Sequence, residues 1–125
     1  MRIVSLNLNG IRSAAKKGVL DWLVKSGADV VCLQELKAQA ADLGAEMINP
    51  DGYYGYFHYA ETKGYSGVGV WSRRQPDAII EGLGIPDIDC EGRYIEVRYG
   101  NLSVVSVYLP SGSSGEHRQI GRAHV

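Results

Sequence analysis

One uninterrupted apolar run constrains the fold of this chain more than any other feature. Residues 29–33 read Asp-Val-Val-Cys-Leu, and the polar pair Gln34 and Glu35 follows directly. A short apolar run without polar alternation is typical of a central strand that is buried on both faces. The run therefore predicts an α/β core built around residues 29–33, with Cys32 as a small residue inside it.

Residues 2–35 predict one β-α-β unit. Residues 2–6 have a strand pattern, residues 7–10 (Asn-Leu-Asn-Gly) indicate a turn, and apolar side chains recur at helical spacing over residues 14–25. Gly27 follows as the expected end of that helix. Both strands deliver polar side chains from their carboxyl ends, which is where α/β proteins commonly place their sites.

The chain continues with one short helix, predicted over residues 38–48, and is expected to be all β after residue 52. A turn is predicted at residues 64–67, and Gly100-Asn101 favours a β-hairpin. A loop over residues 111–115 and the start of a helix over residues 116–119 are expected at the end. The later strands are predicted over residues 53–59, 68–72, 78–81, 93–99 and 102–109.

Composition limits the class of protein without identifying a ligand. The 125 residues are 45% hydrophobic and 22% charged, which is typical of a globular chain. We expect no membrane span and no secretory signal, and two separated cysteines then favour a cytoplasmic location. The net charge of −1 is unlike that of a generic DNA-binding domain, although Arg12, Lys37 and Lys63 could contribute to local basic patches.

Three side chains are candidate site residues because each lies at the carboxyl end of a predicted strand. Glu35 is a carboxylate that must be solvated, paired or bound to a metal, and an ordinary surface glutamate is the alternative. Asn7 offers an amide oxygen beside it, and Mg²⁺ takes such oxygen ligands with waters completing its shell. Tyr108 could donate to a phosphate oxygen, or be an ordinary strand aromatic.

Five segments, in this order, resemble the exonuclease III family of apurinic/apyrimidinic endonucleases, and the resemblance covers residues 1–119. It implies a DNase I-like four-layer α/β sandwich, in which two packed β-sheets are flanked by helices, with this chain supplying only the N-terminal portion. The five segments are SLNLNGIR (5–12), LQELK (33–37), KGYSGVGV (63–70), EGRYI (91–95) and YLPSG (108–112).

The resemblance also implies an activity. Members of the family are DNA-repair nucleases of base excision repair that hydrolyse phosphodiesters at abasic sites and 3′ ends by metal-activated water attack. The expected cofactor is Mg²⁺, with Mn²⁺ as a substitute, and the expected partner is double-stranded DNA rather than a membrane. The full-length parent is expected to be a monomer.

Matching positions imply a role for each site residue. Glu35 is expected to be a metal ligand, Asn7 a metal ligand and catalytic donor beside the scissile phosphate, and Tyr108 a catalytic donor to that phosphate. Asn9 stands where some relatives carry Asp, which leaves its metal role open. The residues expected to bind DNA phosphates are Tyr65, Lys63, Arg12, Gln34 and Lys37.

Two later motifs of the family, a Gly-Asp-x-Asn segment and an Asp-His pair, do not occur in this sequence. No general base is therefore identified, and His58 is expected to be a strand residue. We expect a truncated, inactive and aggregation-prone chain, because the missing strands would leave apolar residues exposed on the inner face of the sheet. Residues 120–125 (IGRAHV) are interpreted as a non-native tail.

Three alternatives stay open on the sequence. The first is a related phosphoesterase on the same fold that acts on nucleotides, inositol phosphates or lipids. The second is a non-catalytic DNA-binding module, which the net charge of −1 and the retained Glu35 disfavour. The third is a gene fragment without function. The Gly-Tyr-Ser-Gly and Glu-Gly-Arg segments favour the DNA-acting enzyme, and salt-sensitive binding of abasic duplex would discriminate it from the others.

Overall fold

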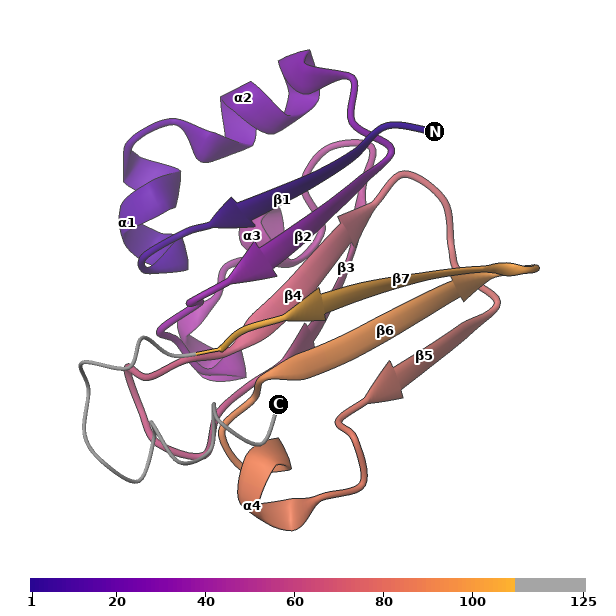
Figure 1. The fold of residues 1–125 in the computed structure, drawn as a ribbon. Helices are drawn as coiled ribbons and strands as arrows, with labels where there is room; N and C mark the ends of the chain where they lie inside the picture. Colours follow the sequence, from indigo (N-terminus) through magenta and orange to yellow (C-terminus); the bar gives the residue numbers. More distant parts are fainter. Residues whose placement is uncertain (110–125) are drawn as a thin grey trace.

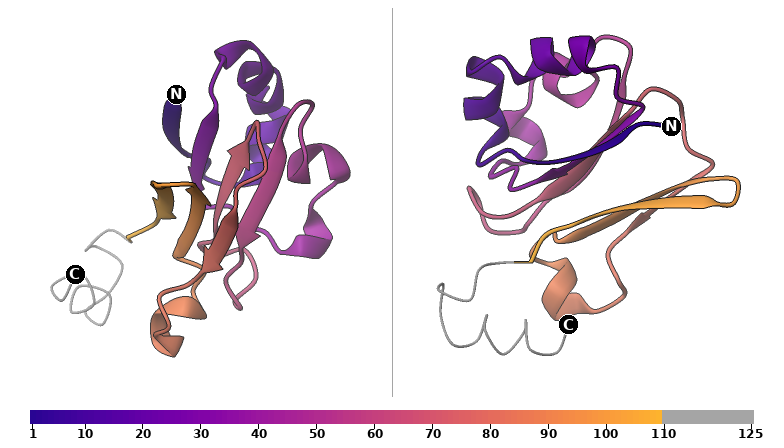
Figure 2. Two further views of the ribbon diagram at one scale, coloured as in Figure 1. Left: turned by 90° about the vertical axis from the view of Figure 1, so that its right-hand side faces the viewer. Right: turned by 45° about the horizontal axis from the view of Figure 1, so that its top comes forward.

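The computed structural model describes residues 1–109 of the chain. The loop predicted at residues 111–115, the helix start at 116–119 and the tail at 120–125 lie outside the described residues. Within residues 1–109, two β-sheets stack face to face, and helices α1, α2 and α3 lie on the outer side of the first sheet (Figures 1 and 2).

The first sheet has the strand order β1-β2-β4-β3. Strand β1 (Ile3–Asn7) runs parallel to β2 (Val30–Gln34), and β4 (Val68–Ser72) pairs antiparallel with both β2 and β3 (Tyr54–His58). Strand β2 is internal, and the four residues Val30–Leu33 are buried, so the predicted central strand is confirmed. The parallel pair β1–β2 is the predicted β-α-β unit.

The connection between β1 and β2 holds two helices where one was predicted. Helix α1 (Ile11–Lys16) ends before Gly18, whose φ of +98° lies in the left-handed region, and α2 (Val19–Ser26) begins after it. Glycine adopts this conformation at little cost, so the chain changes direction there and the continuous helix over residues 14–25 is wrong. Gly27 (φ +70°) ends α2 as predicted.

Two further regions of the chain differ from the helix prediction. The expected helix over residues 38–48 is a 3₁₀ turn, η1 (Ala40–Asp42), and a one-turn helix, α3 (Ala45–Ile48), separated by an extended Leu43. Helix α4 (Pro86–Asp89) interrupts the region expected to be all β. Its start at a proline fits the preference of that residue for the first helical position.

The second sheet is antiparallel, in the order β5-β6-β7. Strand β5 (Ala78–Glu81) pairs with β6 (Tyr94–Tyr99), and β6 pairs with β7 (Leu102–Val107). The register aligns Tyr99 with Leu102, which confirms the hairpin around Gly100-Asn101.

Alternation along β2 divides the interior into two cores. Val31 and Leu33 face the helices and pack with Leu23 and Trp71, whereas Val30 and Cys32 face the second sheet. The predicted burial of Cys32 is confirmed. The second core lies between the sheets and is completed by Val68, Val70, Ile95, Val97, Tyr99 and Val104.

Within the described residues, the first sheet has the edge strands β1 and β3 and the second sheet has the edge strands β5 and β7. Strand β1 pairs only with β2, and strand β7 pairs only with β6. Ile3, beside the buried Val30 in the register, is 46% exposed, and Val105 and Val107 are exposed on the outer face of the second sheet. In the part of the chain that the structure describes, no helix is long and apolar enough to cross a membrane.

Candidate functional site

The candidate site lies where the parallel strands β1 and β2 end together. The register aligns Asn7 with Gln34, so Glu35 is the first residue after the paired strands. Pairing then continues through the loops, because the Leu8 N–H donates to the Gln34 carbonyl (2.9 Å) and the Gly10 N–H donates to the Glu35 carbonyl (2.8 Å). The two loops, residues 8–10 after β1 and residues 35–37 after β2, are therefore fixed relative to each other beyond the sheet.

A third loop, residues 63–67 before β4, joins the same arrangement. The Leu36 N–H donates to the carbonyl of Gly67 (3.1 Å), and the Lys37 N–H donates to that of Ser66 (2.9 Å). The structure has a turn at residues 63–64 followed by a bend at residue 65, so the turn begins one residue before the predicted range 64–67.

Backbone strain is concentrated in these three loops. Asn9, Glu35, Lys37 and Ser66 are the non-glycine residues with positive φ in the described chain, at values between +47° and +53°. Such conformations cost about 1–3 kcal/mol each and persist only where surrounding structure enforces them. The backbone hydrogen bonds between the loops supply that enforcement, so the side chains leave the backbone in preset directions.

Glu35 collects its partners from three segments. Its side chain, 20% exposed, accepts hydrogen bonds from Tyr108 and Asn7 and lies 3.6 Å from the Lys37 ammonium. Partial burial raises the pKa of Glu35, but the hydrogen bonds from Tyr108 and Asn7 and the Lys37 charge outweigh it. The pKa of Glu35 therefore lies below its ordinary value, and the carboxylate is ionised at neutral pH.

The orientation of the Asn7 amide is set by Asn9. The Asn9 backbone N–H donates to Asn7 Oδ1 (2.9 Å), so the amino group of Asn7 is the part that faces Glu35. The predicted metal contact of the Asn7 oxygen stays a prediction. Asn9 turns its own Oδ1 toward Lys37, whose Nζ donates to it (2.7 Å).

Tyr108 brings the second sheet to the site. It follows β7, and its backbone N–H donates to the Arg93 carbonyl (2.9 Å). This bond holds Tyr108 at the end of the β6–β7 hairpin, and its side chain reaches Glu35 on the first sheet. Asn7, Glu35 and Tyr108, predicted from three separate strand ends, are thus brought together.

The residues predicted to bind phosphate occupy different surroundings at this end of the molecule. Arg12 is exposed in the first turn of α1, Lys63 is exposed on the third loop, and Tyr65 is half-buried beside it. Gln34 lies between the sheets, where its amide donates to Ser5 Oγ (3.2 Å) and Ser106 Oγ (3.3 Å). Its predicted phosphate contact stays a prediction.

The sequence left the metal role of Asn9 open and did not single out Ser106, although both residues support the site. The Asn-x-Asn-Gly sequence is a signal for Asn9, because asparagine tolerates the left-handed region and forms turns through its side chain. Ser106 faces inward because it alternates with exposed Val105 and Val107, and its hydroxyl donates to the Leu33 carbonyl (2.8 Å).

The donor chemistry fits part of a divalent metal site. Glu35 offers a carboxylate and Asn9 offers an amide oxygen, which suit Mg²⁺, an ion that commonly takes one or two carboxylates and keeps several waters. Among residues 1–109, no cluster of three or more His, Cys, Asp or Glu side chains could hold a metal. Glu35 and Asn9 are therefore the oxygen donors that the described residues offer at this point.

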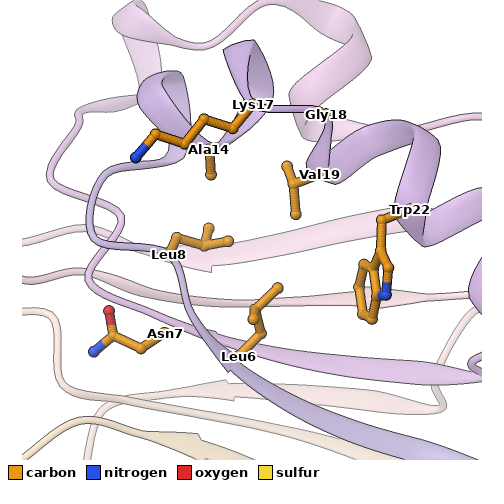
Figure 3. A pocket seen from close by; sticks show the side chains of 8 residues that line it. All are labelled: Leu6, Asn7, Leu8, Ala14, Lys17, Gly18, Val19 and Trp22. Atoms are coloured by element: carbon orange, nitrogen blue, oxygen red, sulfur yellow. The ribbon is translucent and has the colours of Figure 1, made fainter.

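An apolar cavity of about 310 Å³ lies on the other face of β1, beneath α1 and α2 (Figure 3). Leu6, Val19 and Trp22 gather in it, and Asn7 lies at one end. Its lining offers Lys17 as the charged group, so it lacks the carboxylate chemistry of the Glu35 site.

Comparisons with known proteins identify sequence relatives of this chain. A model of the Endonuclease/Exonuclease/phosphatase family matches residues 4–124. An exodeoxyribonuclease of Bacillus subtilis is 39% identical over 119 residues, which cover 94% of this chain and 46% of that protein. A DNA-(apurinic or apyrimidinic site) endonuclease of Dictyostelium discoideum is 37% identical over 119 residues, covering 94% of this chain and 33% of that protein.

A solved structure shows the same fold. The catalytic domain of APE2 from Xenopus laevis superposes with a TM-score of 0.81 at 29% identity, covering 96% of this chain and 49% of that one. The DNase I-like α/β sandwich expected from the sequence is confirmed. The chain spans less than half the length of each of these three relatives.

Proposed function

Because this chain belongs to the endonuclease/exonuclease/phosphatase family, we propose that it is the N-terminal part of a DNA-repair nuclease that hydrolyses phosphodiesters at abasic sites and at 3′ ends. The observation that carries the proposal is the ionised Glu35, held by Asn7 and Tyr108 where two parallel strands end. The names of the relatives, an exodeoxyribonuclease and a DNA-(apurinic or apyrimidinic site) endonuclease, support the substrate class.

The proposed roles follow from the chemistry of each group. Glu35 would hold Mg²⁺, or Mn²⁺ in its place, with Asn7 beside it. The bound ion supplies Lewis-acid stabilisation of the charge that develops on phosphate oxygens. Tyr108 and the Asn7 amide are donors placed next to Glu35, and such fixed donors stabilise that charge without reorganising.

DNA positioning is proposed for the rim of the site. Five residues lie on the three loops or on the strand and helix ends that flank them. They are Lys37, Lys63 and Tyr65 on the loops, Gln34 at the end of β2 and Arg12 in the first turn of α1. Contacts from such residues to phosphates orient a duplex without reading its sequence. A cytoplasmic location, a monomeric parent and a boundary of the native domain at residue 119 stay predictions.

Catalysis is proposed to need groups beyond those assembled here. No general base is identified in the sequence, and residues 1–109 offer no metal cluster of three acidic, His or Cys side chains. We therefore propose that the chain by itself binds DNA weakly and does not cleave it.

Binding of a fluorescent duplex with one abasic-site analogue tests the proposed substrate. Fluorescence anisotropy is expected to show saturable binding that weakens steeply with salt, because phosphate contacts release counterions. Lys63→Glu should weaken binding, whereas the matched control Lys25→Glu, on α2 near the opposite end of β2, should leave it unchanged. Equal effects of the two substitutions, or preferential binding of an inositol phosphate, would exclude the DNA assignment.

A further inference from the structure

We propose that the Lys37 ammonium contacts the same two groups that a divalent cation would bind, the Glu35 carboxylate and the Asn9 amide oxygen. Lys37 and the cation therefore compete for Glu35 and Asn9. This inference rests on the proposed function of the same site. The property concerned is the affinity of the site for the metal. We assign the control of that affinity to Lys37.

The contacts form a closed ring of four residues. The Asn9 N–H donates to Asn7 Oδ1, and the Asn7 amide donates to Glu35. Lys37 Nζ lies 3.6 Å from Glu35 Oε2 and donates to Asn9 Oδ1 at 2.7 Å, which closes the ring. The ammonium thus bridges the carboxylate and the amide oxygen that a hard cation would prefer.

The ring has a fixed side and a movable side. Asn9 and Glu35 lie in loops joined by backbone hydrogen bonds, so the positions of their backbones do not depend on the Lys37 side chain. The Lys37 side chain is 42% exposed and has a long flexible stem, so its ammonium can withdraw to solvent. A divalent cation between Glu35 and Asn9 would therefore displace Lys37 and leave the loops in place.

Charge gives the direction of the effect. Glu35 contributes one negative charge, which the Lys37 ammonium already compensates. A cation arriving beside a retained ammonium meets like charge at short range, and a cation that displaces it must break one ion pair and one hydrogen bond. Both routes weaken cation binding, so removing the ammonium should strengthen it.

Direct Mn²⁺ binding tests this without any activity measurement. The free Mn²⁺ signal in electron paramagnetic resonance would be titrated with the unmodified chain, Lys37→Met, Lys37→Gln and the control Lys25→Met. We expect both Lys37 variants to bind Mn²⁺ about tenfold more tightly, as expected for release from one competing charged contact. Lys25→Met should match the unmodified chain, and Glu35→Gln should abolish binding.

The outcomes separate this inference from the proposed function. Binding that Glu35→Gln abolishes, but that is unchanged or weaker in both Lys37 variants, overturns the competition and leaves the Glu35 metal site standing. Absence of Glu35-dependent binding in every variant overturns the metal site and the competition together. A near-ultraviolet circular dichroism spectrum that retains the signal of buried Trp71 confirms that each variant is folded.

Discussion

Single residues at the site depend on partners that are distant in sequence. Glu35 could be predicted as a site residue because a carboxylate follows a buried strand, but its hydrogen bond with Tyr108 spans two sheets. The contact between Gln34 and Ser106 likewise joins residues 72 positions apart. Local pattern carries no information about such pairs, so the strand-end residues were predictable and their mutual contacts were not.

Removing the Tyr108 hydroxyl should raise the pKa of Glu35. Tyr108→Phe deletes a hydrogen bond to the charged carboxylate, worth about 1 kcal/mol at a partly exposed site. Because the folded pKa of Glu35 is lowered, Glu35 stabilises the fold above its unfolded pKa, and that contribution is lost as pH falls through the folded pKa. Carboxyl ¹³C titration by NMR measures the shift, with Tyr54→Phe on β3 as control. An unchanged Glu35 pKa would rule out the contact.

The two cysteines should react with alkylating reagents at very different rates. Burial raises the pKa of Cys32 to about 11, so its thiolate is scarce at neutral pH, whereas Cys90 is half-buried. Iodoacetamide at pH 8 is expected to modify one thiol rapidly, and peptide mapping should identify Cys90. Equal labelling of Cys32 without denaturant would show that the core between the sheets does not form.

At the level of elements, strands were predictable and helix breaks were not. The apolar run of β2 and the Gly100-Asn101 turn are local signals. The first correctly predicted a strand, and the second correctly predicted a hairpin. The break between α1 and α2 depends on Gly18 being held in the left-handed region, and the helical spacing of apolar residues continues through it. Helix α4 has four residues, too few for any periodicity to show.

Two glycines with the same φ angle should differ in their tolerance to alanine. Gly92 and Gly100 both have φ +58°, but a Cβ at Gly92 would lie 2.5 Å from the backbone N of Ala60, whereas nothing lies within 4 Å at Gly100. Gly100→Ala should cost about 1–2 kcal/mol for the left-handed conformation alone. Gly92→Ala should cost about 3 kcal/mol or more. Urea unfolding of both variants measures the difference, and equal costs would contradict the packing of Gly92 against residues 58–60.

On the scale of the whole molecule, the described residues form four edge strands, of which β1 and β7 carry the exposed side chains Ile3 and Val107. The fold comparison confirms the two stacked sheets of the sandwich. The expected instability of this chain, and its need for a second half, stay predictions. They could not be read from composition, because 45% hydrophobic residues suits a complete domain. The exposure of Ile3 and Val107 on edge strands became visible only with the fold.

Those edges should make the isolated chain self-associate. Edge strands with apolar side chains present unpaired N–H and C=O groups to other chains, and lysine on such strands opposes pairing. Ile3→Lys with Val107→Lys should therefore lower the mass measured by light scattering after size-exclusion chromatography. Val24→Lys, at a similarly exposed position on α2, serves as the control. A monomeric unmodified chain with one cooperative melting transition would contradict this expectation.

Incision of a duplex that carries one abasic-site analogue tests the central claim most directly. The 125-residue chain would be compared, with and without Mg²⁺, with residues 1–119 joined to the unmatched remainder of the Bacillus subtilis relative. We expect no incision by the chain alone, and Mg²⁺-dependent incision by the joined protein that Glu35→Ala abolishes. Mg²⁺-dependent incision by the chain alone, lost in Glu35→Ala, would contradict the account, because it would show that this half of the site is catalytically sufficient.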